Sequence, residues 1–409
     1  MSHNETADGA IDAASAELIE ISRDIHAHPE LNYQEFHAAE VLTKSLEAHG
    51  FEVERGSGGV ETAFRGVAQG TGDGPSIGIL VEYDALPDVG HGCGHNLLAI
   101  STLGAGIGAK AALGELPGRV VVIGTPAEEG GGGKVRLLEA GALDDIDVAL
   151  SSHPSSDKTV FRTDWPMEAN VSLAMVGYRY MFHGKAAHAA GKPEAGVNAL
   201  NAVIHFFTGI DAMRQHLKDD VRIHGIISDG GGAPNVVPEF AAANFMLRSK
   251  DGEYLRETVV PRVLGIAEGA AGMTGATLEV EPHYPFYANV RPNVALTELT
   301  KAHAERLGMR LDEPEPASQR GGGGSTDFGN VSQVMPSFAM SFAISEEPVP
   351  GHSKLWAAAA HSELGEQNAL LCAKALSATA CELLERPELV AATKKEFEAR
   401  GEAIANASD

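Results

Sequence analysis

The chain has 409 residues, which is long enough for two domains. Hydrophobic residues make up 44% of it and charged residues 21%, an ordinary composition for a soluble globular protein. A formal net charge of −25 argues against nucleic acid or an anionic membrane as a partner, because both attract basic patches. Three cysteines cannot build a disulfide framework, and no signal-peptide pattern opens the chain, so we expect a protein of the reducing cytoplasm.

In chain order, two amphipathic helices are predicted first, near residues 10–27 and 33–49. Strand-like apolar runs follow near residues 60–67 and 77–81, and helices then alternate with strands as far as residue 150. This alternation is typical of an α/β domain in which a mostly parallel sheet is flanked by helices.

The most apolar stretch, residues 96–114, is rich in Gly and Ala and carries Lys110, which favours a buried helix over a membrane span. It contains Gly104-Ala105-Gly106-Ile107-Gly108-Ala109, which fits the dinucleotide-binding pattern G-x-G-x-x-[GA] and suggests a nucleotide-dependent enzyme. That pattern requires a turn between a strand and a helix, whereas this copy lies within a predicted helix. The context therefore disfavours nucleotide binding.

The pattern changes after about residue 171 and indicates a small inserted domain. Strand, helix, strand, strand, helix and strand follow in the order βαββαβ, near residues 171–184, 197–215, 221–227, 239–248, 254–271 and 277–281. The first domain is expected to resume near residue 289, with a helix near 353–384 and a charged terminal helix near 388–403. We therefore predict one domain from residues 1–170 and 289–409, and an inserted α+β domain from residues 171–288.

A thiol and two imidazoles crowd into the segment His91-Gly92-Cys93-Gly94-His95. Cys thiolate and neutral His are common ligands of zinc and of similar transition metals, and the glycines allow a close backbone approach. A metal site needs about four ligands per ion, and more candidates follow predicted strand ends. The adjacent carboxylates of Glu128 and Glu129 come after the apolar run 120–123, and His153 comes after the run 147–150. His352 lies in a Gly/Pro turn before an Ala-rich helix.

Six motifs in the same order along nearly the whole chain resemble a known family. They lie at residues 24–31, at 84–87 with 92–95, and at 126–131, 184–189, 234–239 and 325–332. The chain is similar to the di-metal amidohydrolases that include hippuricases, auxin-conjugate hydrolases and aminobenzoyl-glutamate hydrolases. These are relatives of aminoacylase and carboxypeptidase G, in metallopeptidase family number twenty. The resemblance implies a zinc-exopeptidase-like catalytic domain with an inserted lid and dimerisation domain.

The resemblance also implies a role for each matching residue. The expected metal ligands are Cys93, His95, Glu129, His153 and His352. Zn²⁺ is the expected metal, with Mn²⁺ or Co²⁺ as alternatives, as one or two ions per subunit. Glu128 is expected to be the general base, and Asp84 to orient a ligand. His188 matches a lid histidine that serves the neighbouring subunit's site, which implies at least a homodimer. Asn235 and Arg248 match positions that hold a substrate carboxylate.

These roles predict a metal-dependent amidohydrolase that acts on a small molecule. It would cleave the amide bond of an N-acyl or N-aroyl amino acid of the hippurate, aminobenzoyl-glutamate or ochratoxin type, giving a carboxylic acid and a free amino acid. A dipeptidase of the same family is the nearest alternative. An alternative from another class is a non-catalytic small-molecule binding protein, which the presence of the base and of all five ligands disfavours.

Overall fold

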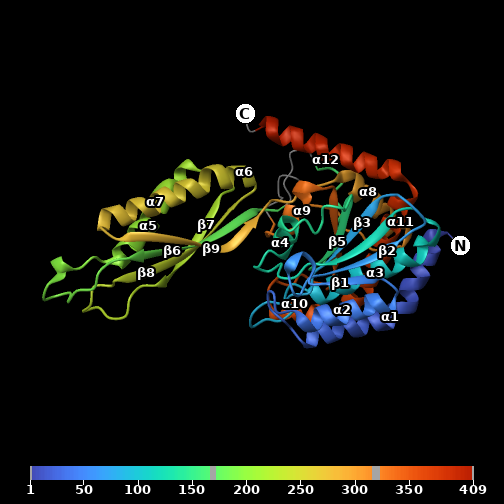
Figure 1. Cartoon of the computed structure of the whole chain (residues 1–409), viewed down its shortest axis with the longest axis horizontal. Coiled ribbons are helices and arrows are strands. Elements are labelled where there is room, and N and C mark those ends of the chain that lie inside the picture. The colour runs from blue at the N-terminus through green and yellow to red at the C-terminus, as the bar shows by residue number, and fades with distance from the viewer. Residues whose placement is uncertain (1, 166–171, 316–322, 408–409) are drawn as a thin grey trace. The chain divides into compact units, whose positions relative to one another are not determined.

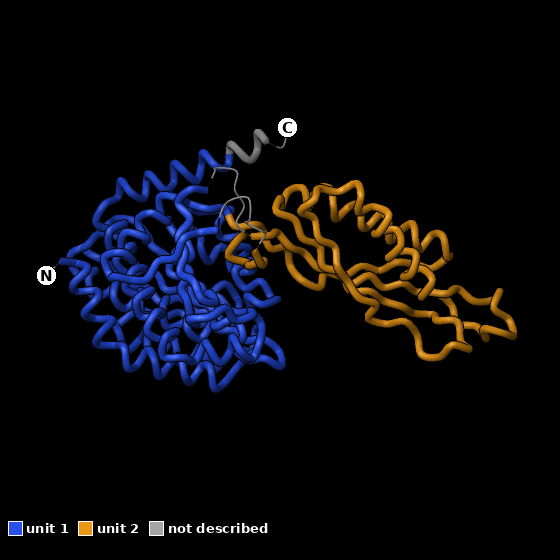
Figure 2. Tube along the Cα trace, turned by 180° about the vertical axis from the view of Figure 1, so that it is seen from behind, with its two compact units in different colours: residues 1–169, 291–321, 330–409 blue, residues 170–290, 322–329 orange. Residues whose placement is uncertain are grey.

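The computed structural model describes residues 2–165, 172–315 and 323–407, with side chains as far as residue 401, and it divides into two compact units (Figure 2). The larger unit comprises residues 1–169, 291–321 and 330–409, and the smaller unit comprises residues 170–290 and 322–329. The expected domain boundary between residues 170 and 171 lies outside the described residues. The sequence pattern does not indicate that residues 322–329 belong with the smaller unit.

A six-stranded sheet forms the centre of the larger unit (Figure 1). Its strands, in the spatial order β1-β2-β4-β3-β5-β10, are Glu52–Arg55, Phe64–Gln69, Arg119–Gly124, Ser76–Val81, Val148–Ser155 and Ser337–Ala343. The strands from β4 to β10 run parallel, whereas β1 and β2 pair antiparallel at one edge. The expected, mostly parallel α/β sheet is therefore confirmed. The sequence pattern does not reveal β1, because this strand is short and mostly exposed.

Helices cover this sheet, and three of them, α1 (His3–Ala27), α3 (His95–Ala112) and α11 (Glu363–Glu385), share its main hydrophobic core. The other helices of the larger unit are α2 (Phe36–Ala48), α4 (Gly133–Glu139), α8 (Val294–Arg306), α10 (Lys354–Ala359), α12 (Pro387–Ala407) and α9 (Phe328–Val334), whose first two residues belong to the smaller unit. Two expectations were wrong in their bounds. The first helix begins near residue 3, because Ser2 and Glu5 form a reciprocal capping box. The helix expected near 353–384 is two helices, because Ser362 caps the start of α11.

α3 explains the glycine-rich stretch that fits the dinucleotide pattern. A Cβ on Gly104 would lie 3.1 Å from side-chain atoms of Leu18 and Ala373, and one on Gly106 would lie 2.4 Å from Val122 of β4. These glycines therefore let α3 pack closely between α1, α11 and the sheet. The helix is long and apolar enough to cross a membrane, but 83% of its most apolar window is buried inside the protein. The structure thus agrees with the expectation of a buried core helix.

The smaller unit is a four-stranded antiparallel sheet with two long helices. Its strands, in the spatial order β7-β8-β6-β9, are Arg222–Asp229, Phe240–Ser249, Ala174–His183 and Thr277–Tyr287. Its helices are α5 (Ala199–Met213), the short α6 (Gly252–Tyr254) and α7 (Val260–Thr274). α5 and α7 share a second hydrophobic core with one face of the sheet. The long elements follow the predicted βαββαβ order along the chain.

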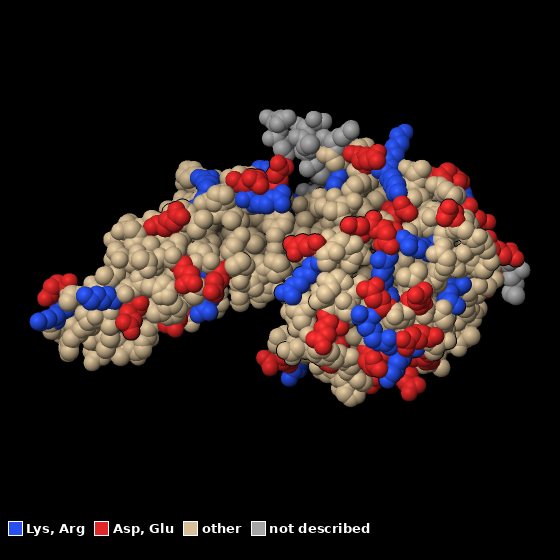
Figure 3. All heavy atoms as spheres, viewed as in Figure 1, with Lys and Arg blue, Asp and Glu red and all other residues tan. Residues whose placement is uncertain are grey.

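Charged side chains of both signs are interspersed over the visible surface of each unit (Figure 3). Many of them pair, as Arg55 does with Glu47 at 2.6 Å and Arg306 with Asp8 at 2.7 Å. Exposed pairs of this kind contribute about 0–1 kcal/mol each, so they have little influence on where the fold places its site.

Candidate metal centre

The expected functional residues of the larger unit lie near one edge of the central sheet, in loops, at the start of α3 and near the end of β5. β3, β4 and β5 run parallel, so their carboxyl ends share that edge, which is the usual ligand edge of an open α/β sheet. Asp84 follows β3, and Glu128 and Glu129 follow β4. His153 lies near the end of β5. Strand direction therefore brings these chain segments, which are remote in sequence, to one edge of the sheet.

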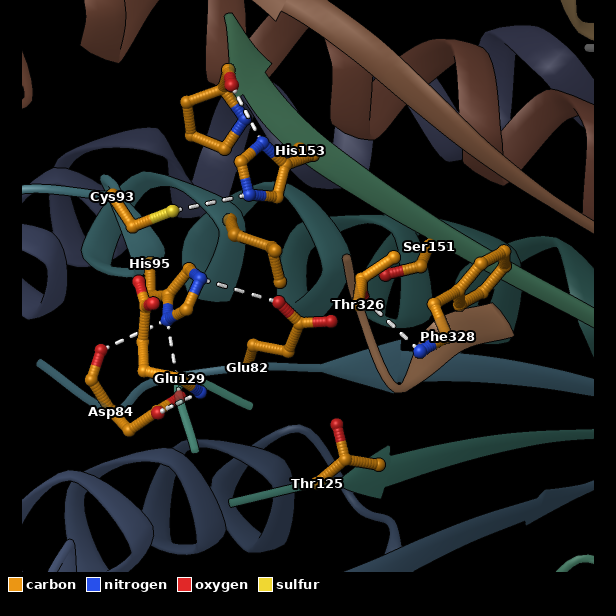
Figure 4. Close-up of polar contacts among 12 residues, drawn as sticks. Glu82, Asp84, Cys93, His95, Thr125, Glu129, Ser151, His153, Thr326 and Phe328 are labelled. Carbon is orange, nitrogen blue, oxygen red and sulfur yellow. Dashed lines mark hydrogen bonds and ion pairs between the residues drawn. The ribbon is translucent and has the colours of Figure 1, made fainter. Parts of the chain in front are cut away.

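Cys93, His95 and His153 form a first trio, whose ligand atoms all lie within 4.8 Å of one another. Sγ of Cys93 is 3.4 Å from Nε2 of His153, and Nδ1 of that ring lies 2.7 Å from the Pro154 carbonyl oxygen (Figure 4). Gly94 has a φ of +83°, and a Cβ there would lie 3.0 Å from Pro154. The glycine therefore allows the backbone to bring the thiol and the imidazoles to one point.

Cys93 also belongs to a second trio, with Glu129 and His352, which meets the same 4.8 Å limit. Nε2 of His352 lies 3.6 Å from Oε2 of Glu129. Oε1 of Glu129 is buried and has no hydrogen-bond partner in the described part of the chain, as is expected of an atom that awaits a cation. His352 comes from the turn before α10 and is exposed. The two trios share Cys93, so together they offer five ligand atoms for one or two cations.

Asp84 fixes both His95 and Glu129. Nδ1 of His95 donates to the carbonyl oxygen of Asp84 at 2.9 Å and to its Oδ1 at 3.1 Å, which leaves Nε2 directed towards the centre. Oδ2 of Asp84 accepts the N–H of Glu129 at 2.9 Å. Burial acts to raise the pKa of Asp84, but His95, the N–H of Glu129 and the charge of Lys134 together keep this pKa below its usual value. An ionised Asp84 therefore orients one candidate ligand from each trio.

The electrostatic surroundings suit a cation. Burial lowers the pKa of His153, and His95 acts in the same direction, so His153 is held in the neutral form that binds metals. Burial raises the pKa of the Cys93 thiol, and Glu129 adds to that effect while His95 opposes it. A cation would offset this penalty on the thiolate. The residues present thus fit a centre for a borderline-soft divalent metal such as zinc.

Glu128 lies at the same place, with Glu82 and Lys134 close by. Glu128 is 6% exposed, and its carboxylate is within 4.8 Å of ligand atoms of His95 and Glu82. Oε1 of Glu82 is 2.8 Å from Nζ of Lys134. Its Oε2 is 3.4 Å from Nε2 of His95 (Figure 4). The sequence motifs assign no role to Glu82 or Lys134. The sequence features that could have pointed to them are the position of Glu82 directly after a wholly buried strand and that of Lys134 directly after a run of glycines.

His91 lies outside both trios. Its Nε2 is 3.0 Å from the carbonyl oxygen of Ile25, and its ring stacks on His26 with the centroids 6.0 Å apart. Nε2 of His26 contacts the carbonyl oxygen of Ala357 at 2.8 Å, and its ring stacks on His361 at 5.0 Å. These rings thus join α1, the segment 91–95 and the end of α10.

The three remaining candidates, His188, Asn235 and Arg248, belong to the smaller unit. Nδ1 of the exposed His188 accepts the N–H groups of Ala190 and Gly191, which leaves Nε2 as a potential donor to solvent or to a ligand. Asn235 lies beside it, since its carbonyl oxygen accepts the N–H of Ala189 at 3.0 Å.

Arg248 lies on β8, on a different segment of the chain from His188 and Asn235. Its Nη1 donates to the Ser325 hydroxyl at 3.1 Å, and its Nη2 lies 3.0 Å from the sulfur of Met246. Ser325 is the first residue of the motif at residues 325–332, so this hydrogen bond connects the start of that motif to β8. The catalytic and substrate-binding roles of His188, Asn235 and Arg248 stay predictions.

The fold and the cluster at the carboxyl edge of its sheet suit a metal-dependent enzyme. The chain belongs to the peptidase family M20/M25/M40, whose model matches residues 78–378. The family resemblance drawn from the sequence motifs is thereby confirmed.

Relatives of this chain act on several related amides. The chain is 36% identical to the Xaa-Arg dipeptidase of Mus musculus, across 95% of this chain and 91% of that protein. It is also 36% identical to one of the subunits of the p-aminobenzoyl-glutamate hydrolase of Escherichia coli, across 66% of this chain and 59% of that protein. Similarity over nearly the full length therefore extends to a dipeptidase.

Solved structures share the fold. An aminobenzoyl-glutamate utilization protein from Klebsiella pneumoniae superposes with a TM-score of 0.71 and 21% identity, covering 93% of this chain and 99% of that one. A dinuclear metal-binding peptidase of family M20 from Bacillus subtilis superposes with a TM-score of 0.67 and 23% identity, covering 91% of this chain and 99% of that one.

Proposed function

We propose that this enzyme hydrolyses the amide bond of an N-acylated amino acid with a free carboxylate, and that dipeptides are its main substrates. The observation that carries the proposed chemistry is the pair of ligand trios that share Cys93, with Glu128 beside them. A dipeptide is itself an amino acid acylated on nitrogen, so hippurate-like and aminobenzoyl-glutamate-like compounds present the same bond. End-to-end similarity to Xaa-Arg dipeptidases favours the dipeptide class.

The proposed metal is Zn²⁺, as two ions. Cys93, His95 and His153 would hold one ion, and Cys93, Glu129 and His352 the other. The shared thiolate favours zinc over Mn²⁺, which prefers oxygen ligands. Bound there, the ions would polarise the scissile carbonyl group and lower the pKa of a water molecule to about 7.

Glu128 is the proposed general base. Its carboxylate takes a proton from the attacking water and later delivers that proton to the nitrogen of the leaving amino acid, so that the C–N bond breaks and the proton balance closes. Asp84 keeps His95 and Glu129 in place while this happens, through the bonds to Nδ1 and to the backbone N–H. His188 is the proposed donor to the carbonyl oxygen, where negative charge develops.

The substrate carboxylate is proposed to meet Asn235 and Arg248. Arg offers two parallel N–H donors to a carboxylate, and the present partners of Arg248 are a hydroxyl group and a thioether rather than a carboxylate. The net charge of −25 also suits a substrate with a cationic side chain, because the field of the protein attracts it.

We also propose a homodimer that assembles through the smaller unit. β7 is an edge strand of its sheet, and residues 224–229 are exposed along it, including Ile226 at 64% and Ile227 at 44%. An apolar edge strand with unpaired backbone groups favours pairing with another strand. Such a dimer would let His188 serve the partner's centre, as the family resemblance implies. All three cysteines are free, as expected for the cytoplasm we propose.

The test is a substrate screen combined with metal analysis. Purified protein is loaded with Zn²⁺, Mn²⁺ or Co²⁺ and incubated with alanyl-arginine, hippurate, aminobenzoyl-glutamate and an N-acetyl amino acid, while the released amine is measured. We expect about two metal equivalents per chain and the highest kcat/KM for the dipeptide. Stoichiometric metal with no hydrolysis of the panel would overturn the substrate proposal, and a protein that binds no metal would overturn the chemistry.

A further inference from the structure

The loop that carries Glu128 and Glu129 contains a backbone conformation that needs support. Ala127 has a φ of +59°, in the left-handed region that residues with a Cβ rarely adopt. Its carbonyl oxygen accepts the N–H groups of Gly131 and Gly132 at 2.9 and 2.8 Å, which closes the loop into a turn. Such a conformation persists where neighbouring groups hold it, and here it sets the direction of the backbone that carries the next residue, Glu128.

Glu35, remote in sequence, holds Ala127. Its side chain is fully buried, and its Oε1 accepts the N–H groups of Ala127 and Tyr33, both at 2.9 Å. Its Oε2 accepts the hydroxyl group of Thr62 at 2.9 Å. A buried carboxylate is costly unless it is hydrogen-bonded, so these bonds fix Glu35 as well as Ala127.

Tyr33, two residues earlier, holds the other end of the turn. Its hydroxyl group donates to the carbonyl oxygen of Gly131 at 2.5 Å, and the guanidinium group of Arg136 lies 4.3 Å from the centre of its ring. A Cβ on Gly131 would lie 2.5 Å from Cε2 of Tyr33, so the ring packs directly on this backbone. One short segment, residues 33–35, therefore contacts both ends of the turn.

Glu128 thus lies between two anchored backbone positions. On one side Glu35 holds the N–H of Ala127, and on the other Asp84 holds the N–H of Glu129. We infer that Glu35, assisted by Tyr33, is a positioning residue that directs the carboxylate of Glu128 towards the metal centre. This inference rests on the proposed role of Glu128 as the base, but it also makes a claim about backbone order that needs no activity.

The experiment compares Glu35→Met, Glu35→Gln and Tyr33→Phe with wild type. Met removes the acceptors, whereas Gln keeps one carbonyl oxygen for both N–H groups and offers its NH₂ group to Thr62. We expect kcat of Glu35→Met to fall by about 10- to 100-fold, with KM and metal content little changed. Glu35→Gln is expected to stay within a few-fold of wild type, and Tyr33→Phe to lie between the two.

Hydrogen–deuterium exchange provides a readout that is independent of activity. In Glu35→Met, exchange in residues 126–132 is expected to speed up by about tenfold, because the turn opens more often. The matched control is Glu30→Gln. Glu30 is a second carboxylate at the start of α2, and it accepts the N–H groups of His37 and Ala38 rather than that of the loop. This control should alter exchange in α2 and leave kcat and residues 126–132 unchanged.

Rescue separates positioning from general loss of structure. Gly at position 127 takes a positive φ without strain, so Ala127→Gly added to Glu35→Met should recover part of kcat. The inference would be overturned if Glu35→Met had the kcat and the loop exchange of wild type. It would also be overturned if Glu30→Gln lowered kcat and sped up exchange in residues 126–132 as much as Glu35→Met does. If Glu35→Met does not fold, unchanged loop exchange in Tyr33→Phe overturns it instead. An active Glu128→Gln enzyme would overturn the proposed function but would leave the exchange result standing.

Discussion

Glu128 is the residue whose substitution most directly tests the chemistry. Glu128→Gln preserves the shape of the side chain and removes its ability to accept a proton. We expect kcat to fall by about 10²- to 10⁴-fold while the metal content stays at the wild-type level. Steady-state kinetics and elemental analysis of the same preparation would measure both. Glu139→Gln, on the exposed end of α4, is the matched control and should behave as wild type. Undiminished turnover in Glu128→Gln would exclude the role of base.

Lys134 and Glu82 form a buried ion pair beside His95, and this makes a stability prediction. Neither side chain is accessible to solvent beyond a few per cent, and their charged atoms are 2.8 Å apart. Lys134→Met removes the ammonium partner of this buried carboxylate, so it should lower the free energy of unfolding by about 3–5 kcal/mol. Urea unfolding of metal-free protein would measure this. Adding Glu82→Gln should recover part of the loss, whereas additive losses would contradict a direct pair.

At the scale of elements, α3 depends on its glycines for close packing. A Cβ on Gly106 would lie 2.4 Å from Cγ2 of Val122, so Gly106→Val should destabilise the protein by about 1–3 kcal/mol. Gly9→Ala in α1 is the control, because nothing lies within 4 Å of its Cβ position. There, the better helix propensity should add about 0.5–1 kcal/mol. Thermal unfolding would compare the two, and a neutral Gly106→Val would argue against tight packing of α3 on β4.

The sequence predicts helices and strands well where the spacing of hydrophobic residues determines them. The apolar runs before Asp84, Glu128 and His153 are enough to expect parallel strands, and parallel strands bring the loops that follow them to one edge. The break between α10 and α11 is less visible, since it depends on one cap at Ser362 within an Ala-rich stretch. Side-chain partners that are remote in sequence are the least visible. The bond from Glu35 to Ala127 spans 92 positions, and no local pattern encodes it.

At the scale of the whole molecule, the order of the motifs predicts the family, but it does not test the proposed homodimer. His188 lies in the smaller unit, and the proposal assigns it to the centre of a partner chain. His188→Ala should therefore lower kcat by about 10²- to 10³-fold, because one preorganised donor to the oxyanion is lost. The metal content should not change, since His188 belongs to neither trio.

Mixed dimers of His188→Ala and Glu128→Gln test whether the site is shared between chains. In a mixed dimer, the centre that keeps Glu128 receives an intact His188 from the other chain, so one of its two centres regains both groups. Random association of equal amounts should restore about a quarter of wild-type activity, although each variant alone is nearly inactive. Co-expression with two affinity tags would isolate the mixed species. A double variant carrying both substitutions on one chain, mixed with Glu128→Gln, is the control and should stay inactive, because every centre in that mixture lacks the base. If the mixed dimers of the two single variants also stay inactive, His188 does not act across the interface.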